Sequence, residues 1–162
     1  MLEREYILGL SVFPGIGSKR FAALLNKFGN AQNIWNASVF DLKNVIGEKL
    51  AFQFETFRKD FAISFYTQKL VQSRVEYITI GDKNYPSLLR KTPEPPFILY
   101  VTGDANVLSF PKTLAVVGTR KITDYGEHVT KLLTSQLVEQ DFVIISGLAI
   151  GVDTIAHKTA ID

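Results

Sequence analysis

Two glycine-containing loops follow apolar runs in the second half of the sequence. Gly118-Thr119-Arg120 ends the run "TLAVV", and Ser146-Gly147 ends the run "FVII". Ligands of open α/β sheets bind beyond the carboxyl ends of the strands, so the two loops are candidates for one site. Glycine lets the backbone approach a ligand closely, and an arginine guanidinium binds a phosphate with two parallel N–H groups. The residue types therefore predict a phosphate-binding site.

Neither loop has the glycine spacing of a nucleotide-binding enzyme. Neither fits G-x-G-x-x-G or G-x-x-x-x-G-K-[ST], so we expect no ATP or NAD, no other cofactor and no metal. The chain has no cysteine, which excludes disulfides, thiolate metal ligands and a cysteine nucleophile. Its net charge is only +2, so any anion-binding surface must be built locally from a few residues.

The loops imply a βαβ unit that positions them. Between the two apolar runs lies "DYGEHVTKLLTSQLVEQ", an amphipathic helix with its apolar face formed by Val129, Leu132, Leu133, Leu137 and Val138. "FILYVTG", "TLAVVG" and "FVIISG" are continuously apolar, which predicts strands of a parallel sheet covered on both faces. A sheet with this small number of strands and helices would leave apolar faces exposed. We therefore expect this chain to be the front part of a longer protein.

The first part of the sequence has a helical pattern instead. Apolar residues at steps of three and four predict one long helix through Leu50, Phe54, Phe57, Phe61 and Phe65. Ser38 followed by Asp41 predicts a helix N-cap. We therefore predict an α/β protein with an all-helical domain over residues 1–74, followed over residues 75–162 by the first part of a Rossmann-like, mostly parallel sheet. The proline-rich segment 81–97 is expected to be an ordered connector packed across that sheet.

A glycine pair near the N-terminus suggests a second ligand site. "PGIGSKR" places Gly15 and Gly17 before Lys19, the pattern of a helix-hairpin-helix. Such a turn can present backbone N–H groups to a phosphate, with Lys19 or Arg20 adding charge. "NVIGEKLA" is a fainter copy that keeps only Gly47. Packing or protein docking is an alternative use of both hairpins, and the sequence leaves the two readings open.

The sequence predicts no membrane segment. Its start, "MLEREYILGL", is charged within five residues and lacks a long apolar core, and no apolar run reaches the 18 residues of a transmembrane helix. We therefore expect a cytoplasmic protein that does not associate with membranes.

Three motifs together resemble a known family. "VVGTRKITDYG", "SGLAIGVDTIAH" and the upstream "YPSLL…PPFILYVTG" occur in the order and spacing of the DNA-processing protein A family, called DprA or Smf, and the resemblance covers the whole chain. It implies a SAM-like helical domain before a Rossmann-like domain. It also implies that the protein binds single-stranded DNA without catalysis and assists loading of the recombinase RecA in natural transformation, with the full-length protein forming a homodimer.

The resemblance also implies the DNA-binding residues. Arg120 matches the arginine of the family's basic pocket, and the flanking loops line that pocket. The residues carried over by position are Gly118, Thr119, Arg120, Ser146 and Gly147, and the predicted DNA-binding set also includes the neighbouring Lys121 and Gly151. One departure is Ile150, which stands where family members usually have Lys or Arg. The loss of this cation should weaken phosphate binding.

Other polar residues are expected to have structural roles. Asp153 should brace the helix after the second loop, His157 should be structural, and His128 should lie on a helix surface. Burial is the expected state of Tyr85 and Tyr125, with stacking on bases as the alternative. For Arg120 the alternatives are a solvated side chain and an ion pair with Asp124.

Two other functions fit parts of the sequence. A nucleoside-monophosphate phosphoribohydrolase of the lysine-decarboxylase-like (LOG) family has a related sheet, but its P-G-G-x-G-T-x-x-E signature does not occur in these 162 residues. A module that only docks a protein partner through its helical domain is the third reading.

Overall fold

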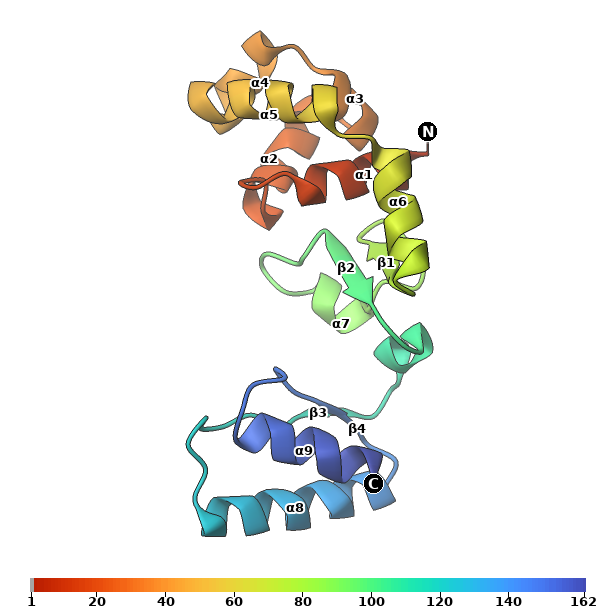
Figure 1. Ribbon diagram of the computed structural model, residues 1–162, viewed down its shortest axis with the longest axis vertical. Coiled ribbons are helices and arrows are strands. Elements are labelled where there is room, and N and C mark those ends of the chain that lie inside the picture. Colours follow the sequence, from red (N-terminus) through yellow and green to blue (C-terminus); the bar gives the residue numbers. More distant parts are fainter. Residues whose placement is uncertain (1) are drawn as a thin grey trace. The chain divides into compact units, whose positions relative to one another are not determined.

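The computed structural model describes residues 2–162, which form two compact units. The first unit ends at Ser109, and the second spans Phe110–Asp162. The first unit contains α1 (Glu3–Val12), α2 (Ser18–Phe28), α3 (Ala31–Asn36), α4 (Val39–Ile46), α5 (Glu48–Asp60), α6 (Ile63–Gln72), β1 (Glu76–Thr79), α7 (Ser87–Arg90), β2 (Ile98–Val101) and the 3-10 helix η1 (Ala105–Ser109). The second contains β3 (Thr113–Ala115), α8 (Asp124–Glu139), β4 (Val143–Ile145) and α9 (Val152–Ile161) (Figure 1).

The division into units and the change in sequence pattern fall at different places. The sequence changes from helical to strand-rich near residue 75, whereas the compact units meet between Ser109 and Phe110. The predicted division of the chain into domains 1–74 and 75–162 therefore stays a prediction. Among the described residues, no helix is both long and apolar enough to cross a membrane.

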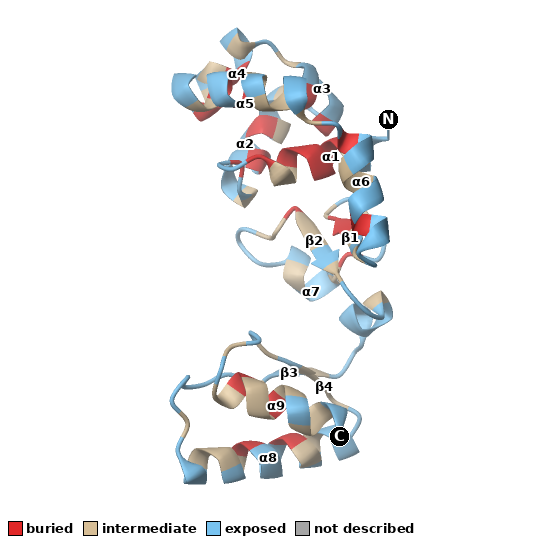
Figure 2. Cartoon of the chain, in the orientation of Figure 1, coloured by how far each residue is buried: buried red, intermediate tan, exposed pale blue. Residues whose placement is uncertain are grey.

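The core of the first unit is aromatic. Figure 2 shows α1 as the most continuously buried helix, and its Leu8 and Leu10 are fully enclosed. Phe54 of α5 is also fully buried, and it makes edge-on contacts with Phe13 at 5.2 Å and Trp35 at 5.5 Å between ring centroids. Edge-to-face aromatic pairs contribute about 0.5–1.5 kcal/mol each beyond the area that they bury. This core holds the predicted helix-hairpin-helix pairs, α1–α2 and α4–α5, in place.

Local signals mark the helix ends correctly in one case and incorrectly in another. The Ser38 hydroxyl accepts a hydrogen bond from the Asp41 amide, which confirms the predicted N-cap of α4. The single long helix expected through Phe65 is wrong, because α5 ends at Asp60 and α6 begins at Ile63. The extended backbone of Phe61 interrupts the helix, so that Ile63 is buried in the core while Phe65 is 57% exposed.

The strand expected over residues 97–103 does not join the parallel sheet. β2 instead pairs antiparallel with β1, with Tyr77 opposite Tyr100. The ring of Phe97, just before β2, stacks on Phe21 of α2 at 4.1 Å and so belongs to the core of the first unit. The expectation of a parallel partner for this segment is therefore wrong. A continuous apolar run is typical of any buried strand, and here one end of it packs on a helix.

The proline-rich connector is ordered, as expected, but it belongs to the first unit, where it links the antiparallel strands β1 and β2, and the expectation that it packs across the parallel sheet is wrong. Tyr85 is only 3% exposed, and its hydroxyl donates a 2.6 Å hydrogen bond to the Pro96 carbonyl oxygen. This bond closes the segment into a loop, with α7 between its two ends. Leu88 of α7 is exposed, so only part of the connector's apolar surface is buried.

The second unit has the predicted βαβ topology. β3 and β4 are parallel neighbours, with Thr113, Leu114 and Ala115 opposite Val143, Ile144 and Ile145. α8 connects them, and α9 packs against α8 (Figure 1).

The burial of this second unit differs from the expectation. Its strands are not covered on both faces, since Leu114 and Ile145 are exposed. The buried side chains of α8 are the small Thr130 and Thr134, because they lie on the face that is enclosed within the unit. Most of the predicted apolar face, including Leu132 and Leu133, is exposed.

Candidate nucleic-acid interface

The two predicted loops leave the sheet at the same edge. Beyond the last paired residues, the Val116 amide donates to the Ile145 carbonyl oxygen at 2.9 Å, and the Ser146 hydroxyl donates back to the Val116 carbonyl oxygen at 2.6 Å. The segments Val116–Thr119 and Ser146–Gly151 therefore start side by side. The structure brings together the loop residues that the sequence assigns to one site.

Gly151 locks the second loop onto the first. Its φ is +91°, a conformation that favours glycine, and a β-carbon here would collide with the Thr119 carbonyl oxygen and lie 2.8 Å from the Arg120 Cα. The next amide, of Val152, donates to the same Thr119 oxygen at 3.1 Å. The Thr119–Arg120 peptide is thus held in place by the first turn of α9.

Gly118 has a packing role that the sequence does not reveal. A β-carbon on Gly118 would lie 2.7 Å from Cγ2 of Val152. The sequence argument attributes this glycine to close approach by a phosphate, whereas the side chain of Val152 already occupies the space. Val152 is the residue that sequence reasoning missed. Its only sequence signal is its position as a β-branched residue directly after Gly151.

Asp153 has a structural role, as predicted, but it braces the loop before α9 and not the helix itself. Its side chain is 6% exposed, and Oδ2 accepts hydrogen bonds from the amides of Gly147 at 3.0 Å and Ala149 at 3.5 Å. Burial disfavours the carboxylate, but hydrogen-bond donation by the backbone amides of Ala149, Gly147 and Gly118 outweighs it, and the pKa of Asp153 is lowered. A charged aspartate therefore sits beneath the loops at neutral pH.

The cations of the site point to solvent. Arg120 and Lys121 are exposed, and in the part of the chain that the structure describes their side chains make no ion pair or hydrogen bond. The alternative ion pair between Arg120 and Asp124 is therefore not formed. The Thr119 hydroxyl accepts from the Lys121 amide at 3.1 Å, which closes a tight turn that presents both cations. Such a turn offers two positive side chains on a rigid support.

The aromatic and histidine predictions have mixed outcomes. Tyr85 is buried as expected, but Tyr125 is 78% exposed, so the expected burial of Tyr125 is wrong. Tyr125 lies in the first turn of α8, where it lines the open pocket between β3 and α8. His128 is exposed on α8, as predicted. His157 on α9 is partly buried and its Nε2 has no hydrogen-bond partner among the described residues.

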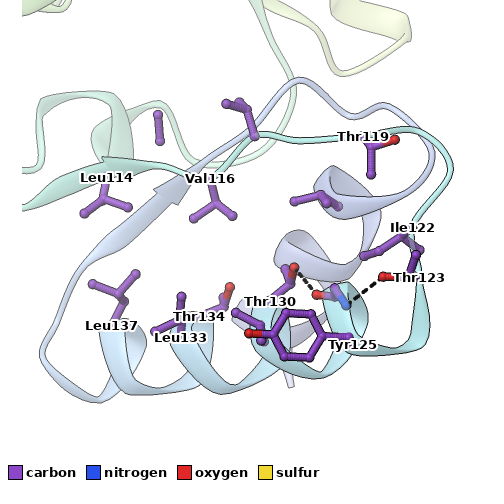
Figure 3. A pocket seen from close by; sticks show the side chains of 15 residues that line it. Leu114, Val116, Thr119, Ile122, Thr123, Tyr125, Thr130, Leu133, Thr134 and Leu137 are labelled. Carbon is purple, nitrogen blue, oxygen red and sulfur yellow. Dashed lines mark hydrogen bonds between the residues drawn. The ribbon is translucent and has the colours of Figure 1, made fainter.

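A pocket of about 490 Å³ lies next to this edge, between β3 and α8. In Figure 3, Leu114 and Val116 of the strand side face Leu133 and Leu137 of α8, and the Tyr125 ring lies at the near side. No charged side chain lines this pocket in the described part of the chain. Its walls are suited to apolar groups, and the cations of the turn lie outside it.

The first N-terminal hairpin shows how its two glycines differ. Gly15 has φ +112°, and a β-carbon there would lie 2.8 Å from Leu50, so the turn packs against the second hairpin. The Arg20 guanidinium donates to the Gly15 carbonyl oxygen at 2.7 Å. Gly17, the N-cap of α2, has nothing within 4 Å of an added β-carbon, and Lys19 is exposed. The fold therefore explains Gly15 but not Gly17.

The chain is similar to a family of DNA-processing proteins. Residues 76–162 match the family described as DNA recombination-mediator protein A. The chain is 30% identical over 164 residues to Protein Smf of Synechocystis sp., covering 98% of this chain and 41% of that protein. It is 38% identical over 87 residues to DNA processing protein DprA of Bacillus subtilis, covering 54% of this chain and 29% of that protein.

A solved structure has the same fold. The X-ray structure of DNA processing protein A from Streptococcus pneumoniae aligns with a TM-score of 0.74 at 24% identity, over 97% of this chain and 53% of that one. The predicted fold class, a helical part followed by the start of a parallel α/β sheet, is therefore confirmed. The chain spans less than half the length of the two curated relatives.

Proposed function

Because the chain belongs to the DNA recombination-mediator protein A family, we propose that it binds single-stranded DNA through the loops beyond β3 and β4 without reacting with it. The observation that carries the proposal is the turn at Thr119–Lys121. It presents two exposed cations, Arg120 and Lys121, on a backbone that Gly151 holds in place. Membership of this family does not favour the phosphoribohydrolase alternative.

Each loop residue has a different part in this proposal. Arg120 and Lys121 contact phosphates, because a guanidinium and an ammonium supply the charge that phosphate binding needs. Gly118 and Gly151 allow the two loops to pack closely, and Ser146 and Gly147 are held by internal hydrogen bonds. Ile150, exposed in the second loop, supplies no charge. The site is therefore weaker than one with a third cation.

The partners belong to the same proposal. A protein that holds single strands without altering them is suited to passing them to a RecA-type recombinase, as the motifs imply. We therefore propose that the whole protein assists such loading, acts as a homodimer in its full-length form, and works in the cytoplasm. None of these steps requires a cofactor.

The experiment that tests this function compares the affinities for single-stranded and duplex DNA, and then checks whether the bound DNA has been chemically changed. The protein should bind a labelled single-stranded oligonucleotide more tightly than the matching duplex, measured by fluorescence anisotropy at fixed salt. Binding should be similar for oligo-dT and mixed sequences, since phosphate contacts carry no sequence information. The recovered oligonucleotide should be chemically unchanged. Equal affinity for duplex, or a cleaved or modified oligonucleotide, would exclude the proposed function.

The first hairpin is proposed as a second site that contacts single-stranded DNA. Its open space at Gly17 lies at the N-terminus of α2, beside the exposed Lys19, and the fold does not otherwise require glycine there. Backbone amides at such a position can hold a phosphate oxygen. The contact requires Gly15 to shape the turn, while Arg20 is already used to stabilise it.

Replacing Gly17 by alanine tests this contact. We expect the Gly17→Ala variant to bind single strands about tenfold more weakly, because a β-carbon would block one hydrogen bond to a charged group. Its free energy of unfolding should fall by at most about 1 kcal/mol, the scale of an N-cap change.

Gly15→Ala is the matched control. It should lower the free energy of unfolding more than Gly17→Ala does, since its β-carbon would meet Leu50 at a positive φ, and any loss of DNA affinity should accompany that loss of stability. Unchanged DNA affinity in folded Gly17→Ala would assign the hairpin to packing or protein docking.

A further inference from the structure

An internal carboxylate occupies the backbone donors beyond the end of β4. The N–H groups of Gly147 and Ala149, called here the amide pair, both point at Oδ2 of Asp153, at 3.0 and 3.5 Å. A β-carbon on Gly147 would lie 2.9 Å from the same oxygen. The carboxylate is thus seated against the loop, and its contact with Gly147 leaves no room between them.

The position of the amide pair is one where α/β proteins commonly bind an external anion. Successive N–H groups after a strand and before a helix N-terminus form a concave site for phosphate. In this chain the same donors are satisfied by a group from α9 itself, and the hydrogen bonds keep that group charged. A phosphate oxygen would meet both an occupied pair of donors and a negative charge.

The carboxylate also connects the two loops. It receives hydrogen bonds from Gly147 and Ala149 in the second loop, and the Gly118 amide of the first loop faces it. Gly151 and Val152, directly before it in the chain, contact Thr119 and Gly118. Removal of the carboxylate would therefore loosen the second loop, which would then be held to the turn that carries Arg120 by the contacts of Gly151 and Val152 alone.

We propose that Asp153 is a positioning residue that fills the anion site of the amide pair, so that small free phosphates are kept out and, at these two loops, DNA phosphates are bound by the side chains of the Thr119–Lys121 turn rather than by the amide pair. The part that concerns DNA rests on the proposed function. The part that concerns the amide pair does not. The inference makes Asp153 a determinant of specificity between a phosphate in a DNA strand and a free phosphate or nucleotide.

An anion-rescue experiment tests the occupancy of the site. In Asp153→Ala the amide pair loses its anion, so the Tm should fall. Sodium formate or inorganic phosphate should restore most of that loss in a saturable way, relative to sodium chloride at equal ionic strength. The wild type should show no such gain, because its site is filled. Asp124→Ala is the matched control, since it removes an exposed carboxylate from the same unit without touching the loops.

A conservative variant keeps the test decisive. Asp153→Asn retains an oxygen that can accept from Gly147, so it should fold, gain nothing from formate and bind single strands nearly as the wild type does. Asp153→Ala should bind single strands more weakly and recover with formate. An alanine variant that stays unfolded in formate, or gains no more from formate or phosphate than from chloride, would overturn the inference.

The two proposals fail in different ways. A wild type that does not bind single strands would remove the proposed function, while the Tm measurements would still decide what occupies the amide pair. An asparagine variant that loses DNA binding to the same extent as alanine would overturn the positioning role, because the hydrogen-bond acceptor would then not be what holds the loop.

Discussion

Replacing Gly151 by alanine should destabilise the second unit by about 3 kcal/mol, the sum of a strained backbone and a steric overlap of ordinary size. Gly151 has φ +91°, and its β-carbon would collide with the Thr119 carbonyl oxygen. The clash involves backbone atoms on both sides, so no side-chain rotation can relieve it. Urea unfolding measures the loss in the free energy of unfolding, and hydrogen exchange at the amides of β3 and β4 shows whether the loss falls in the second unit.

Gly103→Ala separates strain from overlap. Gly103 has a similar φ of +94°, but nothing lies within 4 Å of an added β-carbon. Only the backbone cost of about 1 kcal/mol should remain there. Equal losses in the two variants would show that the packing of the second loop against Thr119 and Arg120 contributes nothing.

Replacing Arg120 by alanine should weaken binding to single strands about tenfold, the effect of losing one charge-assisted hydrogen-bonded contact. The slope of log K against log salt should also fall in magnitude by about 0.7, the value for one phosphate contact on a single strand. Both changes should be the same for oligo-dT and mixed sequences. Arg120 is exposed, so stability should change little. Anisotropy titrations across a salt series give affinity and slope together.

Lys112→Ala is the control for net charge. Lys112 precedes β3 and therefore lies at the amino edge of the sheet, where its Nζ donates to the Gln140 carbonyl oxygen. The Lys112→Ala substitution removes one positive charge from the second unit, as Arg120→Ala does, but it changes no residue of the two loops. If folded Arg120→Ala keeps the wild-type affinity and salt slope, or if Lys112→Ala loses as much as Arg120→Ala, the phosphate role of Arg120 is wrong.

Local patterns in the sequence were sufficient to predict most of the elements. The N-cap of α4 depends on Ser38 and Asp41, three residues apart, and the βαβ unit depends on two apolar runs with an amphipathic helix between them. Each of these signals lies within a short stretch of sequence, so it can be recognised without knowledge of the fold. The glycine loops could be placed at one edge for the same reason, since parallel strands end together.

Apolar periodicity did not determine which surfaces are covered. It did not mark the interruption of the helix at Phe61, the pairing of β2 with β1, or the exposure of Tyr125. Apolar periodicity in the sequence indicates which residues of a helix could be buried, but the elements that pack against the helix determine which of them are buried. α8 illustrates this, because its Thr130 and Thr134 are buried while its Leu132 and Leu133 are exposed.

The candidate site divides along the same line. From the sequence alone it follows that Gly118, Arg120, Gly147 and Gly151 belong to one edge, and the residue types predict phosphate binding. Only the tertiary structure shows what packs against these glycines. The side chain of Val152 occupies the space beside Gly118, and the carboxylate of Asp153 occupies the space beside Gly147. Close approach between segments as far apart as Val116 and Ser146, 30 residues along the chain, leaves no periodic signal, because it depends on where the folded backbone returns.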